Sequence, residues 1–505
     1  MSRSPASLIV QLLFGIPFKA ACLVLMILIP VLGVWVASSM AVFSNRSVLL
    51  PIGAGLLMFP VLPLLWEVLA TRRRERRRIT DTQYLNRLDR LFVRTVVVTG
   101  LFIGGLLWAY PQRAFTALSS HGDWFLGGGK GPRAERVRAL LFKAADRLEW
   151  LHQRSRRNPY KEQEQRSGKP TPAPDPSSLQ PRPQPRPSAE PSTTTPAASR
   201  PAAPTEERAG PPPWPQPVQL HPLVSGLSAD HETSLEAVAR YFRDRTPVDD
   251  WQRARAIHDY IASRVAYDVA ALRSGTFPPQ DAEAVFKSHQ SVCAGYANLF
   301  KAMAEAAGLE AAFIVGDARN SADLGEEKPV DGRSHAWNAV KLDGRWYLVD
   351  VTWDAGHVGE RFERAFSTNY FLTPPAVFGM THFPEESNWQ LLERPLTRGE
   401  FIRQPMLRPG FFAAGLRLRS PDRAQVNVAN ELRIEIENPG GRYLLVSYQR
   451  PGAKKDTDCQ VQGGSLAVAR CSFQEAGTYE VRLCTSTKQY GSYPCEGTLR
   501  VNASL

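Results

Sequence analysis

Residues 334–354, SHAWNAVKLDGRWYLVDVTWD, have the pattern of two β-strands joined by one tight turn. The turn is Asp343-Gly344, a dipeptide typical of two-residue hairpin loops because both positions tolerate a positive φ. A loop of two residues pairs Leu342 with Arg345 and thereby fixes the register of the hairpin. The stretch therefore predicts two strands and also which residues lie opposite one another.

In this register His335 lies opposite Thr352, and Trp337 lies opposite Asp350. His335 and Asp350 are then diagonal neighbours on one face, roughly 7–8 Å apart at the backbone, which an imidazole and a carboxylate can bridge. A slip of one residue would put them on opposite faces. The sequence therefore predicts a His–Asp pair in which the carboxylate orients the imidazole.

A helix is predicted to begin at Cys293, within SVCAGYANLFKAMAEAAG (residues 291–308), and to end at Gly308. The unpaired N–H groups at the start of a helix stabilise an anion, so a thiol there is more available as a thiolate nucleophile. A nucleophile, a base and an orienting carboxylate together perform acyl transfer. We therefore predict that Cys293 is the nucleophile, His335 the general base and acid, and Asp350 the residue that orients His335.

Other residues complete this site or compete for a role in it. Asp354 is the second candidate for the orienting carboxylate but lies further from the turn, and His357 and His382 are expected to be structural. The backbone N–H of Cys293 is predicted to form an oxyanion hole, with Gln290 as the candidate for the second donor. The sequence has neither a DxDxDG-type calcium loop nor the paired CxxC motifs of a zinc site, so no metal and no cofactor are predicted.

The two stretches that carry these residues resemble the transglutaminase-like superfamily, whose fold is related to that of papain-type proteases. The resemblance covers about residues 230–400 and rests on SVCAGYANLFKAMAEAAGLEAAFIVG and SHAWNAVKLDGRWYLVDVTWDAG. It implies an α+β, papain-like cysteine domain over residues 221–405. In that domain the family's nucleophile, base and orienting acid correspond to Cys293, His335 and Asp350.

The resemblance extends to NYFLTPPAVFGMTHFPEESNWQLLERPLTRGEFIRQP, residues 369–405. This segment is similar to the one that follows the catalytic core in the kyphoscoliosis-peptidase-like branch of the superfamily, which also includes fungal cytokinesis proteins. Some relatives in that branch lack activity. The branch implies an immunoglobulin-like domain after the catalytic domain.

The C-terminal region, residues 406–505, is predicted to be an all-β sandwich because short strands alternate with turn residues. In EAGTYEVRLC, Tyr479 is the expected tyrosine corner. Four of the six cysteines cluster here, which indicates disulfides and an oxidising compartment; four reduced core cysteines are the alternative. The favoured pairings, each closing a short loop, are Cys459–Cys471 and Cys484–Cys495. The module is expected to bind substrate or envelope protein partners, or simply to pack on the catalytic domain.

The N-terminal region, residues 1–115, is predicted to cross a membrane three times. Its uncharged stretches are long enough to span a bilayer and lack a polar face; they cover about residues 20–42, 47–69 and 95–112. The arginine-rich loop TRRRERRR (71–78) is expected to be cytoplasmic, which also places the N-terminus in the cytoplasm and the C-terminal domains outside, in the periplasm. A signal peptide with a lipid-modified Cys22 is the alternative.

Two segments connect the membrane region to the catalytic domain. Residues 116–165 are predicted to form a basic amphipathic helix beside the membrane, or one packed on the spans. Residues 166–220 are predicted to be a disordered Pro-rich linker, because positions 170–217 include 17 prolines among 48 residues. Residues 1–160 carry 22 Lys and Arg against 8 Asp and Glu, a charge of +14, which leaves −2 for the rest. No nucleic-acid partner is therefore predicted.

Together these features predict an integral membrane protein whose thiol domain acts outside the cytoplasm on protein or peptide amides. An acyl-enzyme would form at Cys293. Water as the acceptor makes a protease or amidase, the interpretation we favour, and a lysine amine makes a cross-linking transglutaminase. A non-catalytic envelope scaffold that uses the same fold for binding is the alternative from another functional class.

Overall fold

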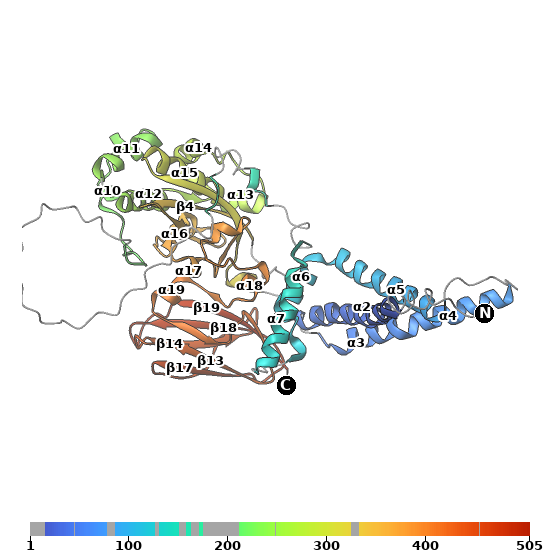
Figure 1. The fold of residues 1–505 in the computed structure, drawn as a ribbon. Helices are drawn as coiled ribbons and strands as arrows, with labels where there is room; N and C mark the ends of the chain where they lie inside the picture. Colours follow the sequence, from blue (N-terminus) through green and yellow to red (C-terminus); the bar gives the residue numbers. More distant parts are fainter. Residues whose placement is uncertain are drawn as a thin grey trace, which may run out of the picture.

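The computed structural model describes residues 16–44, 46–77, 86–126, 131–150, 158–162, 171–174, 212–247, 249–324, 333–453 and 455–504. Figure 1 shows a bundle of long helices, a mixed domain of helices and strands, and a β-rich domain below it. Helices α6 (Pro111–His121) and α7 (Pro132–Asp146) lie between the bundle and the two domains.

Within the described residues, three helices are long and apolar enough to cross a membrane: Cys22–Phe43, Leu49–Arg76 and Arg87–Ala109. They are formed by α2 (Ile16–Phe43), by α3 (Leu49–Leu56) with the π-helical turn Leu57–Val61 and α4 (Leu62–Arg76), and by α5 (Arg87–Ala109). The ends differ from the prediction, because α4 continues into the arginine-rich loop and α5 begins before residue 95. Arginine is a good helix former, so a helix can continue past the end of the apolar stretch that the sequence shows.

The segment predicted as one basic amphipathic helix, residues 116–165, holds more than one helix, and its basic part with helical apolar spacing lies in α7. Helix α6 ends at His121 and α7 begins only at Pro132, and a proline suits the first turn of a new helix. Helix α6 is buried along most of its length. Its Ser119 carbonyl accepts a hydrogen bond of 2.8 Å from Arg403, and α6 also packs on α2 and α5, so this helix fits the alternative of a helix packed on the spans.

The mixed domain is built on a five-stranded antiparallel sheet of order β8-β5-β4-β3-β9. Its strands are β3 (Glu310–Ala318), β4 (Arg333–Leu342), β5 (Arg345–Val349), β8 (Phe371–Thr373) and β9 (His382–Pro384). The helices that share its core are α11 (Leu235–Arg245), α12 (Asp250–Arg264), α14 (Ala282–Ser288) and α15 (Cys293–Ala306). Helix α15 packs directly on β3 and β4, which fixes Cys293 beside the sheet.

The hairpin register predicted from the Asp343-Gly344 turn is confirmed for every pair from Leu342–Arg345 to Asn338–Val349. Both turn residues have a positive φ, of 48° and 76°. The pairs predicted beyond Val349 are wrong, because β5 ends there. Asp350 instead caps helix α16 (Val351–Ala355) by accepting a hydrogen bond of 3.2 Å from the Trp353 N–H, a role that aspartate performs well.

Residues 406–504 form two packed sheets around one apolar core. One sheet has the order β10-β19-β18-β14-β15, with β12 beside β19, and the other has the order β11-β13-β17-β16. The strands are β10 (Met406–Leu407), β11 (Arg417–Ser420), β12 (Gln425–Val428), β13 (Glu431–Glu437), β14 (Tyr443–Gln449), β15 (Thr457–Asp458), β16 (Gln460–Gln462), β17 (Leu466–Ser472), β18 (Gly477–Ser486) and β19 (Cys495–Ala503). Disulfides join Cys459 to Cys471 and Cys484 to Cys495, the pairings expected from the loop lengths. The Tyr479 hydroxyl donates a hydrogen bond of 2.8 Å to an upstream carbonyl, as a tyrosine corner does.

Part of the segment predicted as a disordered linker is folded against the mixed domain. Residues 171–174 and 212–220 are described, whereas 175–211 lie outside the described residues. The Thr368 hydroxyl donates to the Gln216 carbonyl at 2.6 Å, and Arg255 donates to the carbonyls of this segment at 2.9 and 2.8 Å. Proline lacks an N–H but keeps its carbonyl, so side-chain donors of a domain can hold a Pro-rich segment in place.

Candidate active site

The structure brings His335 and Asp350 into direct contact. His335 projects from β4, and Asp350 lies at the N-cap of α16, where its Oδ1 accepts the bond from the helix. Its Oδ2 lies 2.7 Å from the Nε2 of His335. The two side chains are 7% and 1% exposed, so the pair is sheltered from water.

Cys293 completes a chain of three groups. It is the first residue of α15, it is 1% exposed, and its sulfur lies close enough to His335 to act on the charge of that ring. Burial lowers the pKa of His335, but the Asp350 carboxylate and the Cys293 sulfur outweigh burial and raise the pKa to about 10. A sulfur at the start of α15 with an imidazole beside it is the arrangement of a nucleophile and its base in acyl transfer.

A second imidazole shares the Asp350 carboxylate. The Nε2 of His382 lies 3.0 Å from Asp350 Oδ2, and its Nδ1 lies 2.9 Å from the Thr381 hydroxyl. Burial lowers the pKa of His382 to about 4, so its ring is neutral at pH 7. The rings nearest to it, at 4.1 to 5.3 Å between centroids, belong to Phe378, Trp353, Trp337 and Tyr370. His382 was expected to be structural; the structure places it in the site.

His335, Asp350 and His382 also offer three ligand atoms within 4.8 Å of one another, a spacing that a metal ion could use. Both ring nitrogens, however, are hydrogen-bonded to the same carboxylate oxygen. Burial raises the pKa of Asp350, but the two rings lower it well below its usual range. A permanently ionised carboxylate that holds two imidazoles therefore accounts for this cluster of ligand atoms.

Comparison with known proteins identifies the domain that holds these residues. The family model described as the transglutaminase-like superfamily matches residues 236–351, which include Cys293, His335 and Asp350. This chain contains a transglutaminase-like domain. Kyphoscoliosis peptidase of Homo sapiens is 33% identical over 187 residues, which make up 36% of this chain and 28% of that protein. Hillarin of Drosophila melanogaster is 33% identical over 190 residues, which make up 34% of this chain and 23% of that protein.

This chain thus spans less than a third of the length of these curated relatives. The crystal structure of a TGase is 17% identical, with a TM-score of 0.20, and the match covers 29% of this chain and 37% of that chain. The resemblance indicated by the two sequence stretches is confirmed. The protein combines a transglutaminase-like domain with N-terminal apolar helices and a C-terminal β-rich region.

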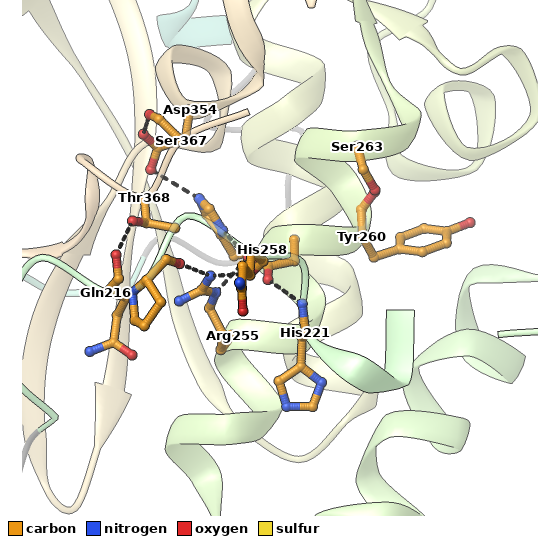
Figure 2. A network of polar contacts seen from close by, with 12 residues as sticks. Gln216, His221, Arg255, His258, Tyr260, Ser263, Asp354, Ser367 and Thr368 are labelled. Atoms are coloured by element: carbon orange, nitrogen blue, oxygen red, sulfur yellow. Dashed lines mark hydrogen bonds and ion pairs between the residues drawn. The ribbon is translucent and has the colours of Figure 1, made fainter. Parts of the chain in front are cut away.

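Within the transglutaminase-like domain, Asp354 belongs to a separate buried network (Figure 2). Its Oδ2 lies 3.1 Å from the Nε2 of His258, and its carboxylate also accepts the backbone N–H of Tyr370 at 3.0 Å. Asp354 is therefore engaged with helix α12 and the start of β8. Of the two aspartates considered for the orienting role, Asp350 is the one in contact with His335.

The surroundings of the Cys293 amide differ from the prediction. Gln290, the predicted second oxyanion donor, lies in the short strand β2 (Gln290–Ser291) with its side chain exposed. Tyr267 lies beside Cys293, and burial together with the Cys293 charge raises the pKa of Tyr267 above its usual range. A neutral phenol thus lies at the amide that would bind an oxyanion. Pairing of Tyr267 with Ser291 brings it there, a contact that no local sequence pattern indicates.

Gly295 allows α15 to pass close to the loop that precedes Cys293. A Cβ at position 295 would lie 2.7 Å from the Val285 side chain and 3.0 Å from Gln280 Oε1, and would also meet the Ser291 hydroxyl. Gln280 Oε1 accepts a hydrogen bond of 2.8 Å from that same hydroxyl. The residues before Cys293 are therefore packed tightly against the first turn of α15.

We expect Gly295→Ala to lower the free energy of unfolding by about 1–3 kcal/mol, because overpacking a tight contact forces backbone shifts. The measurement is chemical unfolding of the purified protein in detergent. Gly359→Ala is the matched control, since the nearest atom to its Cβ is 3.8 Å away. Equal stability of the two variants would contradict the close-packing argument.

The pKa of His382 gives stability a defined pH dependence. Between its ordinary value of 6.5 and about 4, the unfolded chain binds a proton that the folded protein does not. The contribution of His382 is therefore complete above pH 6.5 and falls by about 2 kcal/mol as the pH drops to 5. We expect His382→Gln to flatten the decline of unfolding free energy between pH 7 and 5, with the exposed His357→Gln as control. The same slope in wild type and His382→Gln would refute this.

Proposed function

We propose that this protein is a membrane-anchored thiol enzyme that hydrolyses protein or peptide amides through an acyl-enzyme at Cys293. The 2.7 Å contact between His335 and Asp350, with Cys293 beside it at the start of α15, is the observation that supports the proposal. Protein substrates are supported by the transglutaminase-like domain and by its likeness to a protein named as a peptidase. The disulfides support an oxidising, extracytoplasmic location for the C-terminal domains, and the arginine-rich loop supports a cytoplasmic N-terminus.

In the proposed reaction the Cys293 thiolate attacks the amide carbonyl carbon and forms a tetrahedral oxyanion. The Cys293 N–H and the Tyr267 hydroxyl donate to that oxygen. The C–N bond then breaks as the His335 imidazolium gives its proton to the leaving amine, which leaves a thioester. Water, deprotonated by His335, attacks the thioester and releases the acid and the thiol. Asp350 remains ionised throughout and His382 holds it in place.

The two-sheet C-terminal module with its tyrosine corner is proposed to be immunoglobulin-like, since these features are typical of such domains. Its strand β12 continues from the segment in which Arg423 donates to Asp123 at 3.1 Å. We therefore propose that it anchors the transglutaminase-like domain relative to the membrane helices and offers the surface for envelope protein partners.

The test is labelling of the full-length protein in detergent with an iodoacetamide probe at pH 7, together with peptide cleavage measured by mass spectrometry. We expect Cys293→Ala to abolish both and His335→Ala to slow labelling by about 10²-fold or more. Cys22→Ala, which removes the other unpaired cysteine of the described residues, is the control. Labelling that is unchanged in His335→Ala would favour a non-catalytic scaffold, and incorporation of a primary amine in place of cleavage would favour a cross-linking enzyme.

A further inference from the structure

A short segment from outside the transglutaminase-like domain lies against Cys293. Residues 158–162 precede the Pro-rich region, and Tyr160 is only 5% exposed. Tyr160 shares one buried cluster with Cys293, Phe313, Val315 and Ala336. The ring therefore fills an apolar pocket whose wall includes the candidate nucleophile and β3 and β4.

The segment is held at its two ends by polar contacts. The Asn158 amide donates to the Gly316 carbonyl at 3.1 Å, and Gly316 is the β3 partner of His335. Lys161 Nζ lies 2.9 Å from a Glu385 carboxylate oxygen. The ion pair is largely exposed and therefore weak.

Tyr160 also occupies the approach to the sulfur. It packs in the same buried cluster as Cys293, and Cys293 itself is 1% exposed. A thiol that attacks an amide must present its sulfur to a carbonyl carbon about 3–3.5 Å away. Because Cys293 is buried in a cluster that Tyr160 helps to form, a substrate carbonyl has no open path to the sulfur in this arrangement.

We propose that residues 158–162 hold the candidate active site closed, and that the pocket now filled by Tyr160 receives an aromatic side chain of the protein substrate once the segment leaves. The proposal rests on the function proposed above. The pocket suits such a side chain because its lining of Phe313, Val315 and Ala336 is apolar and already enclosed around a ring. The Tyr160 ring thus shows the kind of side chain that the pocket accepts.

The closure is tested with the full-length protein in detergent by the rate of Cys293 labelling with iodoacetamide. Tyr160→Ala empties the pocket and should raise the rate about tenfold or more, because only the open fraction reacts in the wild type. Tyr160→Phe keeps the ring in place and should stay near the wild-type rate, as should the exposed control Tyr443→Ala. Asn158→Ala, which loosens the segment without touching the pocket, should give a smaller rise.

Two results would overturn the closure. One is unchanged labelling in Tyr160→Ala. The other is slower labelling in both Tyr160 variants, which would show that the hydroxyl assists the thiol.

The aromatic pocket is tested in Tyr160→Ala with acetyl-Phe and acetyl-Ala chloromethyl ketones. The Phe reagent should react about tenfold faster, and equal rates would overturn the pocket assignment. The double variant with His335→Ala separates this proposal from the proposed function. If removing Tyr160 still speeds labelling but His335 has no effect on labelling or cleavage, the closure holds and the enzymatic function fails. If His335→Ala slows labelling and cleavage but Tyr160→Ala leaves labelling unchanged, the enzymatic function holds and the closure fails.

Discussion

Replacing Asp350 by Asn is expected to slow acylation of Cys293 by about 10³–10⁴-fold, comparable to the loss when a triad aspartate is made neutral elsewhere. Asp350 Oδ2 accepts hydrogen bonds from both His335 and His382, at 2.7 and 3.0 Å. An amide nitrogen at that position cannot accept either bond. The charge that raises the pKa of His335 to about 10 is lost as well, so the imidazolium beside Cys293 is no longer favoured.

The measurement is kcat/KM for a cleaved peptide, or the rate constant of probe labelling where no peptide is known. Asp354→Asn is the matched control, because Asp354 is also buried and lies in the same short helix, but it contacts His258 rather than His335. We expect Asp354→Asn to reduce stability while leaving most of the acylation rate. Equal rate losses in the two variants would mean that Asp350 acts through the packing of α16 and not through the imidazole.

The sequence predicted the His335–Asp350 contact for a reason that is only half right. The Asp343-Gly344 turn fixed the register, and the observed pairs follow it as far as Asn338–Val349. Beyond that pair the chain leaves the ladder because Asp350 caps α16, a local signal that competes with strand pairing. The carboxylate reaches the imidazole from a helix cap instead of from a neighbouring strand.

Residues that arrive through long-range pairing could not be predicted in the same way. His382 reaches Asp350 because β9 pairs with β3, with Ala318 opposite His382. Tyr267 reaches the Cys293 amide through a two-residue parallel pairing, and Tyr160 comes from a segment with no regular pattern. Hydrophobic periodicity and turn residues specify local elements, whereas these contacts depend on how distant elements pack.

The largest effect on stability is expected from Asp259→Ala, which should lower the free energy of unfolding by about 3–5 kcal/mol, because removing one partner leaves buried charge uncompensated. Asp259 is fully buried, and it contacts Arg255 and His258, two of the residues labelled in Figure 2. Its carboxylate lies 2.7 Å from Arg255 and 2.8 Å from His258, and it also accepts the backbone N–H of His221 at 2.8 Å. The change therefore leaves a buried guanidinium and a buried imidazole with too few acceptors.

The pH dependence of this loss has a definite sign. Burial lowers the pKa of His258, but its bonds to Asp259 and Asp354 outweigh burial and raise the pKa. The contribution of His258 is therefore complete below its ordinary value of 6.5 and is lost as the pH rises through the raised value. Chemical unfolding should thus show a larger loss of unfolding free energy for Asp259→Ala at pH 6 than at pH 9.

Asp249→Ala is the control. Asp249 caps the N-terminus of α12, and its loss should lower the free energy of unfolding by about 1 kcal/mol at either pH. A loss below that of Asp249→Ala, or one that grows with pH, would show that the network carries little charge.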